Sequence, residues 1–592
     1  MIRKLVNKVY NYAHSLKLSQ KQITMALAIA VGFIAGLVSV VLKNGVFWIQ
    51  WLLAEGFTQD SYNFLYVVYP LLGILITVWI AKRWMKKKPG PGIPTTLYAI
   101  SKRKSILPKH NIYSAMVTSV FTVGFGGSAG LEAPAVQTSA AIGSNLGAAF
   151  KLNYKTKTLL IGCAAAGSLA SIFKAPVAAI IFAVEVFMID LTTVSLIPLL
   201  LASISALLTA NLFLGEDSLL RFQLRSSFEL INLPFFILLG AFTGICSIYF
   251  SKFYMGITRA LESFKKKYVR VLIGGLLLGI IVFIFPPLYG EGYETINFLL
   301  NDNLADVARN SVFYDYRSSV TMMLIFMMGL VIFKVVATGL TIGAGGVGGI
   351  FAPTLFMGST LGFLFARVFK YFNIAELPAS QFTLVGMAGL MAGVLHAPLT
   401  AIFMIAEITG GYELFLPLMV TSAISYSTSR ALSPHTIYTQ ELARRGELIT
   451  HDKDKAVLTL MNLKEEIERG FVVVRDTCTL GDMVAAVRKS TRNVFPIADE
   501  NMRLVGIITL DDIREVMFDK ALYDEIKVVD LMAAPLELIY TTDSMEDVMR
   551  KFEDSQAWNL PVIENQQYIG FVSKSRLFNA YRKLLKEAYN ME

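Results

Sequence analysis

Charge and cysteine are both scarce in this sequence. Only 17% of the 592 residues are charged and 54% are hydrophobic, whereas about a quarter of a typical soluble chain is charged. The three cysteines, Cys163, Cys246 and Cys478, are scattered, which argues against a disulfide framework or a zinc site. The five histidines show no His-Glu-x-x-His spacing, so the sequence offers no zinc motif of an intramembrane metalloprotease.

Long uncharged runs are abundant instead. Ile23–Leu42 carries no charge and is long enough to cross the hydrocarbon core of a bilayer. It is too long for the apolar part of a signal peptide, and no small-residue cleavage site follows it. Further spans are predicted at Tyr62–Ile80, Val194–Phe213, Leu233–Phe250, Val271–Phe285 and Val320–Phe333. The chain is therefore predicted to be a polytopic α-helical membrane protein in contact with lipid.

Positive charge lies beside the apolar runs. The net charge is +10, but the lysines and arginines gather before the first span, after the second, and at Lys265–Lys267. Such an asymmetry is typical of cytosolic loops rather than of a nucleic-acid-binding surface. We therefore expect no nucleic-acid partner, a cytosolic N-terminus and C-terminus, and insertion in the cell (plasma) membrane.

The chain changes character after Tyr438, where a polar segment precedes a soluble α/β pattern. Asn493–Ile513 matches Asn559–Leu577, and two such copies resemble a pair of CBS domains. The elements predicted in the first copy are strands at Phe471–Val474, Asn493–Ala498 and Leu504–Thr509, and helices at Leu480–Lys489 and Asp511–Phe518. The predicted divisions are a cytosolic segment (1–21), a membrane domain (22–440), a linker (441–451) and two CBS copies (452–520 and 521–592).

The membrane part also contains a repeat. Gly167–Val186 matches Gly389–Ile408, and the pairs Pro176/Pro398 and Glu185/Glu407 are each separated by 222 positions. Repeats built from interrupted apolar segments indicate a transporter or channel with its site at the repeat interface, near mid-membrane. The alternative is that small-residue helix interfaces recur by chance.

Three helix starts are rich in glycine and proline. They lie at Gly90–Pro94, Gly126–Pro134 and Gly343–Pro353. Glycine lets the backbone turn, and proline is well tolerated in the first helical turn, where its missing N–H would have no intrahelical partner. Free N–H groups and the helix dipole favour anions at such ends. Several converging starts would hold an anion without a full counter-charge, so the pattern predicts passage of small monovalent anions.

Four motifs carry a resemblance to a known family. They are "GPGIP" (90–94), "GLEAP" (130–134), "GGIFAP" (348–353) and "SPHTIY" (433–438). With them, residues 22–440 resemble the CLC family of voltage-gated chloride channels and proton-coupled chloride exchangers, in which a trailing CBS pair is common. The resemblance implies a transmembrane domain with an inverted internal repeat, and a homodimer with one pore in each subunit.

The resemblance also assigns roles to matching positions. Glu132 stands at the gating glutamate, which occupies an anion site when ionised and moves aside when protonated; the alternative is an acidic residue that stabilises a helix start. Tyr438 matches the tyrosine whose hydroxyl reaches the anion from the cytosolic side, with a simple interfacial tyrosine as the alternative. The anion-binding positions implied are Pro91, Gly92, Ile93, Ile350, Phe351 and Tyr438.

Two departures from the family pattern concern the anion path. Many members have serine where this chain has Pro91, which supplies neither O–H nor N–H. Some plant members with proline there prefer nitrate, so we expect weakened discrimination for chloride over nitrate. Leu131 and Ala133 replace the usual basic residue and glycine around Glu132, which leaves the gating role in place but its details open.

A third departure concerns mechanism. Exchangers of the family carry a second glutamate that passes the proton on the cytosolic side, and the matching position here is Val186. Because valine carries no proton, the sequence favours an uncoupled channel gated by Glu132. The alternative is a proton-coupled chloride or nitrate antiporter, since some exchangers lack this acid. A divalent-cation channel with CBS domains is a weaker alternative: its pore would need several membrane carboxylates or rings of carbonyls, and the anion-type helix starts rich in glycine and proline argue against it.

The CBS pair offers one candidate nucleotide site. In nucleotide-binding CBS domains a serine or threonine contacts phosphate, and an aspartate three residues later binds ribose. Thr509 and Asp512 fit this pattern, whereas the second copy has Ser573 followed by Arg576, which cannot accept from a hydroxyl. We expect at most one complete adenosine site, for ATP, AMP or a cyclic dinucleotide, with a purely structural dimerisation module as the alternative. No other cofactor, no metal and no enzyme chemistry is predicted; chloride is the expected ligand.

Overall fold

The computed structural model divides into two compact units, Met1–Arg445 and Gly446–Glu592, and the boundary falls within the predicted linker. The residues that the structure describes are 19–55, 65–85, 90, 92–215, 220, 228–440, 458 and 461–589. Most of the predicted N-terminal segment, all of the predicted linker and the candidate residue Pro91 lie outside these ranges.

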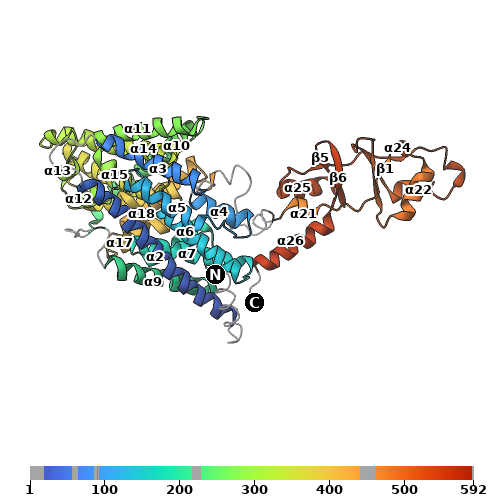
Figure 1. Ribbon diagram of the computed structural model, residues 1–592, viewed down its shortest axis with the longest axis horizontal. Helices are drawn as coiled ribbons and strands as arrows, with labels where there is room; N and C mark the ends of the chain where they lie inside the picture. The colour runs from blue at the N-terminus through green and yellow to red at the C-terminus, as the bar shows by residue number, and fades with distance from the viewer. Residues whose placement is uncertain are drawn as a thin grey trace. The chain divides into compact units, whose positions relative to one another are not determined.

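The N-terminal unit is helical, and every predicted span coincides with a helix (Figure 1). These helices are α2 (Gln20–Glu55), α3 (Leu65–Arg83), α9 (Thr193–Leu214), α10 (Leu233–Glu262), α11 (Lys267–Ile284) and α14 (Val320–Ala344). Within the described part of the chain, two more helices are long and apolar enough to cross a membrane, α7 (Tyr154–Phe173) and α15 (Phe351–Tyr371). Their many glycine, alanine and threonine residues lower the hydropathy, which is why sequence inspection did not single them out as spans.

Shorter helices fill the space between these spans. They are α4 (Ile93–Lys102), α5 (Asn111–Gly124), α6 (Glu132–Ala149), α8 (Pro176–Phe187), α12 (Tyr293–Leu300), α13 (Leu304–Val307), α16 (Ala379–Leu395), α17 (Pro398–Ile408) and α18 (Phe415–Leu432). Three 3-10 turns accompany them, η1 (Leu230–Asn232), η2 (Pro286–Leu288) and η3 (Tyr314–Tyr316). Helices α6 and α15 are buried along most of their length, so their starts lie inside protein rather than in lipid.

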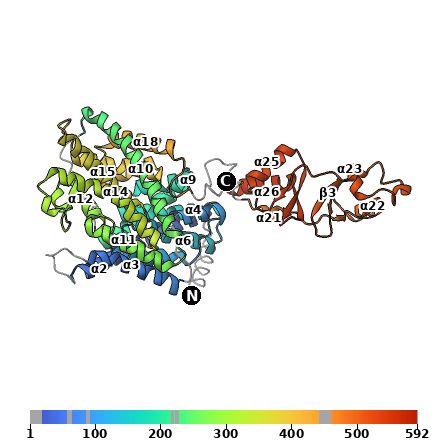
Figure 2. The same ribbon diagram turned by 90° about the horizontal axis from the view of Figure 1, so that it is seen from above.

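The packing of the helices repeats the sequence repeat. In the first half α6 packs on α7 and α2 on α9, and in the second half α15 packs on α16 and α10 on α18. Equivalent helices of the two halves also meet, since α3 packs on α11, as Figures 1 and 2 show, and α8 packs on α17. This correspondence over whole elements excludes chance recurrence of small-residue motifs as the origin of the repeat.

The repeat extends to single backbone angles. Lys174 and His396 end α7 and α16 in the left-handed region, with φ of 57° and 54°. The alanines that follow, Ala175 and Ala397, also match each other, with φ of −124° and −126°, and each precedes the proline that begins α8 or α17. Residues other than glycine rarely adopt the left-handed conformation of Lys174 and His396. Packing therefore imposes the tight connection between the paired helices in both halves.

The C-terminal unit contains two copies of one small sheet. The elements are α21 (Leu463–Glu466), β1 (Val474–Arg475), α22 (Leu480–Lys489), β2 (Val494–Ala498), β3 (Leu504–Thr509), α23 (Leu510–Ile513), η4 (Lys520–Leu522), α24 (Val528–Leu531), β4 (Ile539–Tyr540), α25 (Met545–Ser555), β5 (Asn559–Glu564), β6 (Gln567–Ser573) and α26 (Lys574–Tyr589). In each sheet a short parallel pair, β1/β2 or β4/β5, is followed by an antiparallel pair, β2/β3 or β5/β6. Both antiparallel pairs shift register at the same relative position, between Ile497 and Ala498 and between Val562 and Ile563.

Two element predictions in this unit were too long. The strand expected at Phe471–Val474 pairs only at Val474 and Arg475, because Phe471 instead packs its ring on Phe571, 4.6 Å between centroids. The helix expected at Asp511–Phe518 is α23, Leu510–Ile513, after which the chain continues in turns.

The two CBS copies share backbone hydrogen bonds and one core. Glu468 in the first copy bridges to Phe571 in the second, and Ala533 in the second bridges to Ile507 in the first. The side chains of Phe471, Ile563, Tyr568 and Phe571 form one buried cluster from both copies. Each copy therefore covers an edge and an apolar face that the other would leave exposed.

Candidate functional site

The starts of α6 and α15 lie against each other. Gly130 N–H donates to Gly349 O at 2.9 Å, and Gly349 N–H donates to Gly130 O at 2.7 Å. A Cβ on Gly349 would lie 3.0 Å from Ala133 Cβ, and one on Gly130 would lie 3.0 Å from Ala352 Cβ. Only glycine allows this approach, and it brings two helix N-termini to one point inside the protein.

Two threonines fix the loops before these helices in a reciprocal way. Ser128 N–H donates to Thr341 Oγ1 at 3.1 Å, and Val347 N–H donates to Thr122 Oγ1 at 3.1 Å. Each threonine belongs to the helix that precedes the other repeat's loop. The two loops are therefore held by crossed hydrogen bonds between the halves rather than by contacts within each half.

The start of α4 reaches the same point. Gly92 is its N-cap with φ 74°, a conformation that favours glycine. A Cβ there would lie 3.0 Å from Ala133 Cβ at the start of α6. The predicted anion-site residues Gly92 and Ile93 are both buried at this meeting point, while Pro91 lies outside the described residues.

These helix starts offer free donors. The first backbone hydrogen bonds of α6 and α15 come from Ala135 and Thr354, so the N–H groups of Glu132 and Ala133, and those of Phe351 and Ala352, have no partner within their helices. Partial positive charge gathers at such ends. The arrangement suits an anion or a carboxylate, as the motifs predicted.

The side chain of Glu132 occupies part of the space at the N-termini of α6 and α15. It is the first residue of α6 and only 1% exposed. Tyr293 Oη donates to Glu132 Oε1 at 2.7 Å. The carboxylate also lies beside the amides of Glu132 and Ala352, while Oε2 makes no hydrogen bond of ordinary geometry to any group in the described ranges. The side chain thus sits on the N-termini of α6 and α15 as a tethered anion would.

Phe351 and Ile350 lie where the sequence placed them, at the start of α15. They are 1% and 3% exposed. The Phe351 ring packs against Phe173, 4.9 Å between centroids, and against Phe182 at 6.3 Å. This packing fixes the first turn of α15 and hence the direction of its free N–H groups.

Tyr438 approaches the site from a different part of the chain. It is 5% exposed, and its hydroxyl has no hydrogen-bond partner among the residues that the structure describes. It interacts electrostatically with Glu132 and with Tyr254. A buried hydroxyl without a partner costs free energy. That Tyr438 donates to a bound anion, rather than being a simple interfacial tyrosine, stays a prediction.

Sequence reasoning missed four ionisable groups beside Glu132. Glu291 accepts from Leu131 N–H at 3.1 Å through Oε1, and Tyr293 belongs to the same turn. Lys334 is fully buried, and both it and Lys43 interact electrostatically with Glu132 and Glu291. A sequence signal was present for Lys43 and Lys334, which lie in the long apolar helices α2 and α14, since an ionisable residue inside an apolar span is a functional candidate by default. Glu291 and Tyr293 lie outside such spans and gave no comparable signal.

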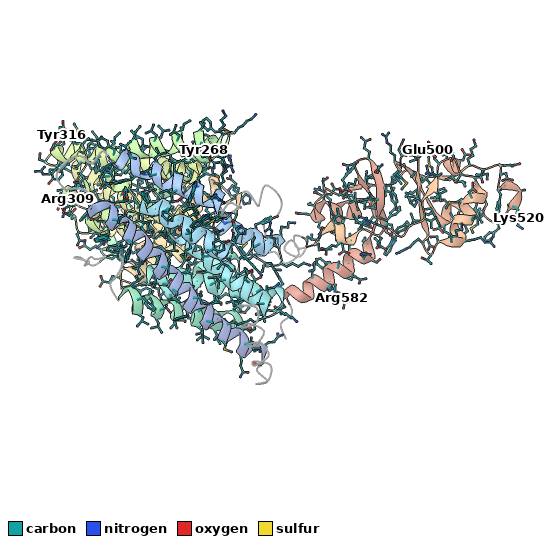
Figure 3. All side chains as sticks on the ribbon, viewed as in Figure 1. Tyr268, Arg309, Tyr316, Glu500, Lys520 and Arg582 are labelled. Atoms are coloured by element: carbon teal, nitrogen blue, oxygen red, sulfur yellow. The ribbon has the colours of Figure 1, made fainter. Side chains whose placement is uncertain are left out.

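Two cavities approach the site. One of about 520 Å³, which we call the Glu291 cavity, is lined by Glu291, Tyr293 and Tyr289 and extends to Arg309, which lies at an edge of the unit (Figure 3). The other, of about 380 Å³, is the Gly92 cavity. Its lining includes Gly92, Pro134, Gln137, Tyr254 and Gly348, and the charged residues Lys82, Lys267, Arg270 and Glu262.

The neighbourhood of Val186 contains a structural acid pair. Val186 is 7% exposed in α8. Glu185 accepts from the N–H groups of Leu399 and Thr400 at 3.1 and 2.8 Å, and Glu407 accepts from those of Val177 and Ala178 at 3.1 and 2.8 Å. Each glutamate caps the helix that carries the other, so the pair Glu185/Glu407 that is matched in the sequence repeat has equivalent contacts in both halves.

The candidate nucleotide residues are adjacent at the end of β3. Thr509 N–H and Oγ1 both lie 2.7 Å from Asp512 Oδ2. In the second copy Ser573 Oγ donates to Glu468 Oε1 at 2.6 Å, and Arg576 pairs with Glu466 at 3.3 Å. Among the described residues no group of three or more histidine, cysteine, aspartate or glutamate side chains could hold a metal ion.

Comparisons with known proteins agree with this architecture. The model of the voltage gated chloride channel family matches residues 72–430, and the CBS domain model matches residues 464–519 and 528–583. A Ralstonia nicotianae protein, whose name describes it as ClcB-like and places it among chloride channel proteins, is 28% identical over 72% of this chain and 97% of its own length.

Other relatives are named as exchangers. The H(+)/Cl(-) exchange transporter ClcA of Vibrio cholerae serotype O1 is 27% identical over 71% of this chain and 88% of its own. The crystal structure of a slow cyanobacterial Cl−/H+ antiporter superposes with a TM-score of 0.59 at 25% identity, covering 72% of this chain and 98% of its own. Since the family model alone spans more than half of the sequence, the chain belongs to the CLC family of voltage gated chloride channels, and it carries a C-terminal pair of CBS domains.

Proposed function

We propose that this protein exchanges chloride or a similar monovalent anion for protons across a membrane. The observation that carries the proposal is the Glu132 carboxylate, buried on the N-termini of α6 and α15. A carboxylate at that place competes with an anion when ionised and can carry a proton when neutral. Relatives named as H(+)/Cl(-) exchange transporters support the same reading.

Exchange replaces the passive channel that the sequence favoured. That preference rested on Val186 alone, and one relative does carry a channel name. Exchange has the stronger support, from relatives named as exchangers and from the similar solved structure of a cyanobacterial Cl−/H+ antiporter. A valine at the inner relay position then means that protons reach the cytosolic side by another group, as in exchangers that lack this acid.

The geometry suggests how Glu132 would couple the two ions. When ionised, its carboxylate takes the place of an anion beside the amides of Glu132 and Ala352. When protonated, it no longer competes, and the free N–H groups of α6 and α15 accept an anion. The second anion position would be formed by Gly92, Ile93, Ile350, Phe351 and the hydroxyl of Tyr438. The protein supplies positioning and electrostatics and makes no covalent bond.

The distribution of lysine and arginine beside the spans supports one orientation of the protein in the membrane. A cytosolic N-terminus places the end of α2 outside, and with it the Glu291 cavity, which includes Gln50 and Leu53. The Gly92 cavity then faces the cytosol, with Lys82, Lys267 and Arg270 to attract anions. Insertion in the plasma membrane, cytosolic termini and assembly as a homodimer remain parts of this proposal.

Flux measured together with proton movement tests the proposal. Purified protein in liposomes, given an outward chloride gradient, is expected to take up protons against their own gradient. Glu132→Gln is the matched variant, since it keeps shape and loses the titratable group, and we expect chloride flux without proton movement. Chloride flux by wild type without any proton uptake would contradict exchange and restore the channel.

Pro91 tests the choice of anion. Because proline offers no hydroxyl donor, we expect Pro91→Ser to raise the ratio of chloride to nitrate flux. Pro94→Ser in the same segment is the control and should leave the ratio unchanged. An identical ratio in wild type and Pro91→Ser would show that this position does not set selectivity.

A further inference from the structure

Glu291 is placed to meet the same helix end as Glu132. It lies between Gly290 and Gly292, with φ of 63° and 88°, in the turn between η2 and α12. This backbone turn presents its carboxylate to α6, where Oε1 accepts from Leu131 N–H at 3.1 Å. Two carboxylates therefore share one helix N-terminus, Glu132 from within α6 and Glu291 from another part of the chain.

The surroundings of the pair contain two positive groups. Lys334 is fully buried, with Nζ 3.4 Å from Gly290 O and 4.5 Å from the centre of the Phe356 ring. Lys43 Nζ donates to Ile172 O at 2.8 Å. Both lysines interact electrostatically with Glu132 and Glu291. Two acids close to one buried lysine, Lys334, and one half-buried lysine, Lys43, form a cluster in which one added proton changes the balance of charge.

Access to solvent separates the two acids. Glu132 is 1% exposed, whereas Glu291 is half-buried and lines the Glu291 cavity. That cavity continues to Arg309 and Asn310, which are exposed. Water can therefore reach Glu291 more readily than it can reach Glu132, and a proton from the cavity meets Glu291 first.

We propose that Glu291 is the outer proton-transfer group of this protein, which loads Glu132 with protons from the Glu291 cavity. The proposal rests on the exchange function argued above. A proton leaves hydronium in the cavity for the Glu291 carboxylate, and hydronium becomes water. It then passes to the Glu132 carboxylate, directly or through one bridging water, which regenerates ionised Glu291 and leaves Glu132 neutral. Release of a proton to the outside follows the same steps in reverse.

The charge of Glu291 has a second consequence. Two carboxylates close together disfavour simultaneous ionisation. Ionised Glu291 therefore promotes protonation of Glu132, and so promotes its departure from the anion position. Tyr293, which donates to Glu132 Oε1 at 2.7 Å, acts in the opposite direction by holding the ionised side chain in place.

Full-length protein in liposomes tests this role through Glu291→Gln. Proton uptake at a fixed chloride gradient should fall by about 10²-fold, the lower end of the range for a positioned proton-transfer group. The external pH at which chloride flux is half-maximal should move to lower values, because the amide no longer opposes a charge on Glu132. Glu291→Asp should recover part of the proton flux. The control is Glu294→Gln, whose exposed carboxylate lies three residues away.

Several outcomes would overturn the inference. Coupled wild-type protein whose Glu291→Gln variant keeps both its proton flux and its external pH profile would rule out Glu291 while leaving exchange intact. Glu294 also lines the Glu291 cavity, so equal losses in Glu291→Gln and Glu294→Gln would indicate a general effect of negative charge in that cavity and would contradict a specific role for Glu291. In a Glu132→Gln background, adding Glu291→Gln should leave chloride flux unchanged, and a further loss there would mean that Glu291 supports the fold instead. Wild-type protein without proton coupling would contradict the proposed function itself.

Discussion

At the residue scale, one hydroxyl holds the carboxylate at the centre of the site. Tyr293 is the residue in the described structure that gives Glu132 a side-chain hydrogen bond, at 2.7 Å. A hydrogen bond to a charged group contributes about 1.5–3 kcal/mol, and 1.4 kcal/mol is a factor of ten. Tyr293→Phe should therefore weaken the seated state of Glu132 and raise chloride flux at neutral external pH by about tenfold, as measured by chloride efflux from liposomes.

A neighbouring tyrosine provides the control for this prediction. Tyr289 lines the same cavity, but its hydroxyl donates to Gly124 O at 3.1 Å rather than to Glu132. Tyr289→Phe should change flux at neutral pH by less than Tyr293→Phe does. Equal increases in both variants would point to loosening of the cavity wall instead of release of Glu132.

What the sequence could predict at this scale follows from distance along the chain. Glu132, Ile350 and Phe351 lie in local motifs, and the structure brings them together as expected. Tyr293 and Glu291 reach α6 from about 160 positions away, so no local pattern links them to Glu132. Lys334 is visible in the sequence as a charge within an apolar run, but only the packing shows that it lies beside Gly290.

At the element scale, reciprocal caps join α8 and α17. The Glu407 carboxylate accepts from the N–H groups of Val177 and Ala178, which have no partner within the helix at its first turn. Removing an N-terminal cap costs about 1–2 kcal/mol. We expect Glu407→Ala to lower the free energy of unfolding by about this amount, measured by urea-induced unfolding in mild detergent.

The same measurement on nearby variants completes the test. Glu185→Ala should cost a similar amount, because Glu185 caps α17 in the same way. Glu413→Ala, at an exposed position after α17, should change stability by much less. If all three variants lost equal stability, the caps would not be the cause.

Elements were predictable where composition marks them. The six predicted spans coincide with helices because long uncharged runs have few alternatives. Helices α7 and α15 were not recognised as spans because their small residues resemble those of buried loops. In the C-terminal unit the first strand is shorter than its apolar run, since Phe471 packs on Phe571 rather than extending a ladder. Tertiary packing, not local preference, decided that boundary.

At the scale of the whole molecule, the candidate anion site and the CBS pair belong to different compact units. The groups that the structure places around Glu132 all come from residues before 440, and the C-terminal unit has buried clusters of its own. If a nucleotide binds the CBS pair, linkage requires that it change transport through the difference in its affinity for the conformations of the protein.

Nucleotide binding at the CBS pair should be measurable as a rise in thermal stability. We expect AMP or ATP to bind full-length protein through Thr509 and Asp512. At a hundredfold excess over Kd a ligand stabilises its site by about 2.7 kcal/mol. A unit of this size should then unfold about 5–11 °C higher. The melting of the C-terminal unit, followed by limited proteolysis with heating, measures the shift.

Variants of the adjacent residues Asp511 and Asp512 distinguish nucleotide binding from loss of the Thr509–Asp512 cap at the start of α23. Asp512→Ala removes the expected ribose acceptor and also the hydrogen bonds to Thr509, so it should lower stability without ligand and abolish the shift with AMP. Asp511→Ala removes an exposed carboxylate that pairs with Arg514 and should keep the shift. A full shift in Asp512→Ala would place the nucleotide elsewhere. The absence of any shift in wild type with AMP, ATP or a cyclic dinucleotide would leave the pair as a structural module, held by the core that both copies share.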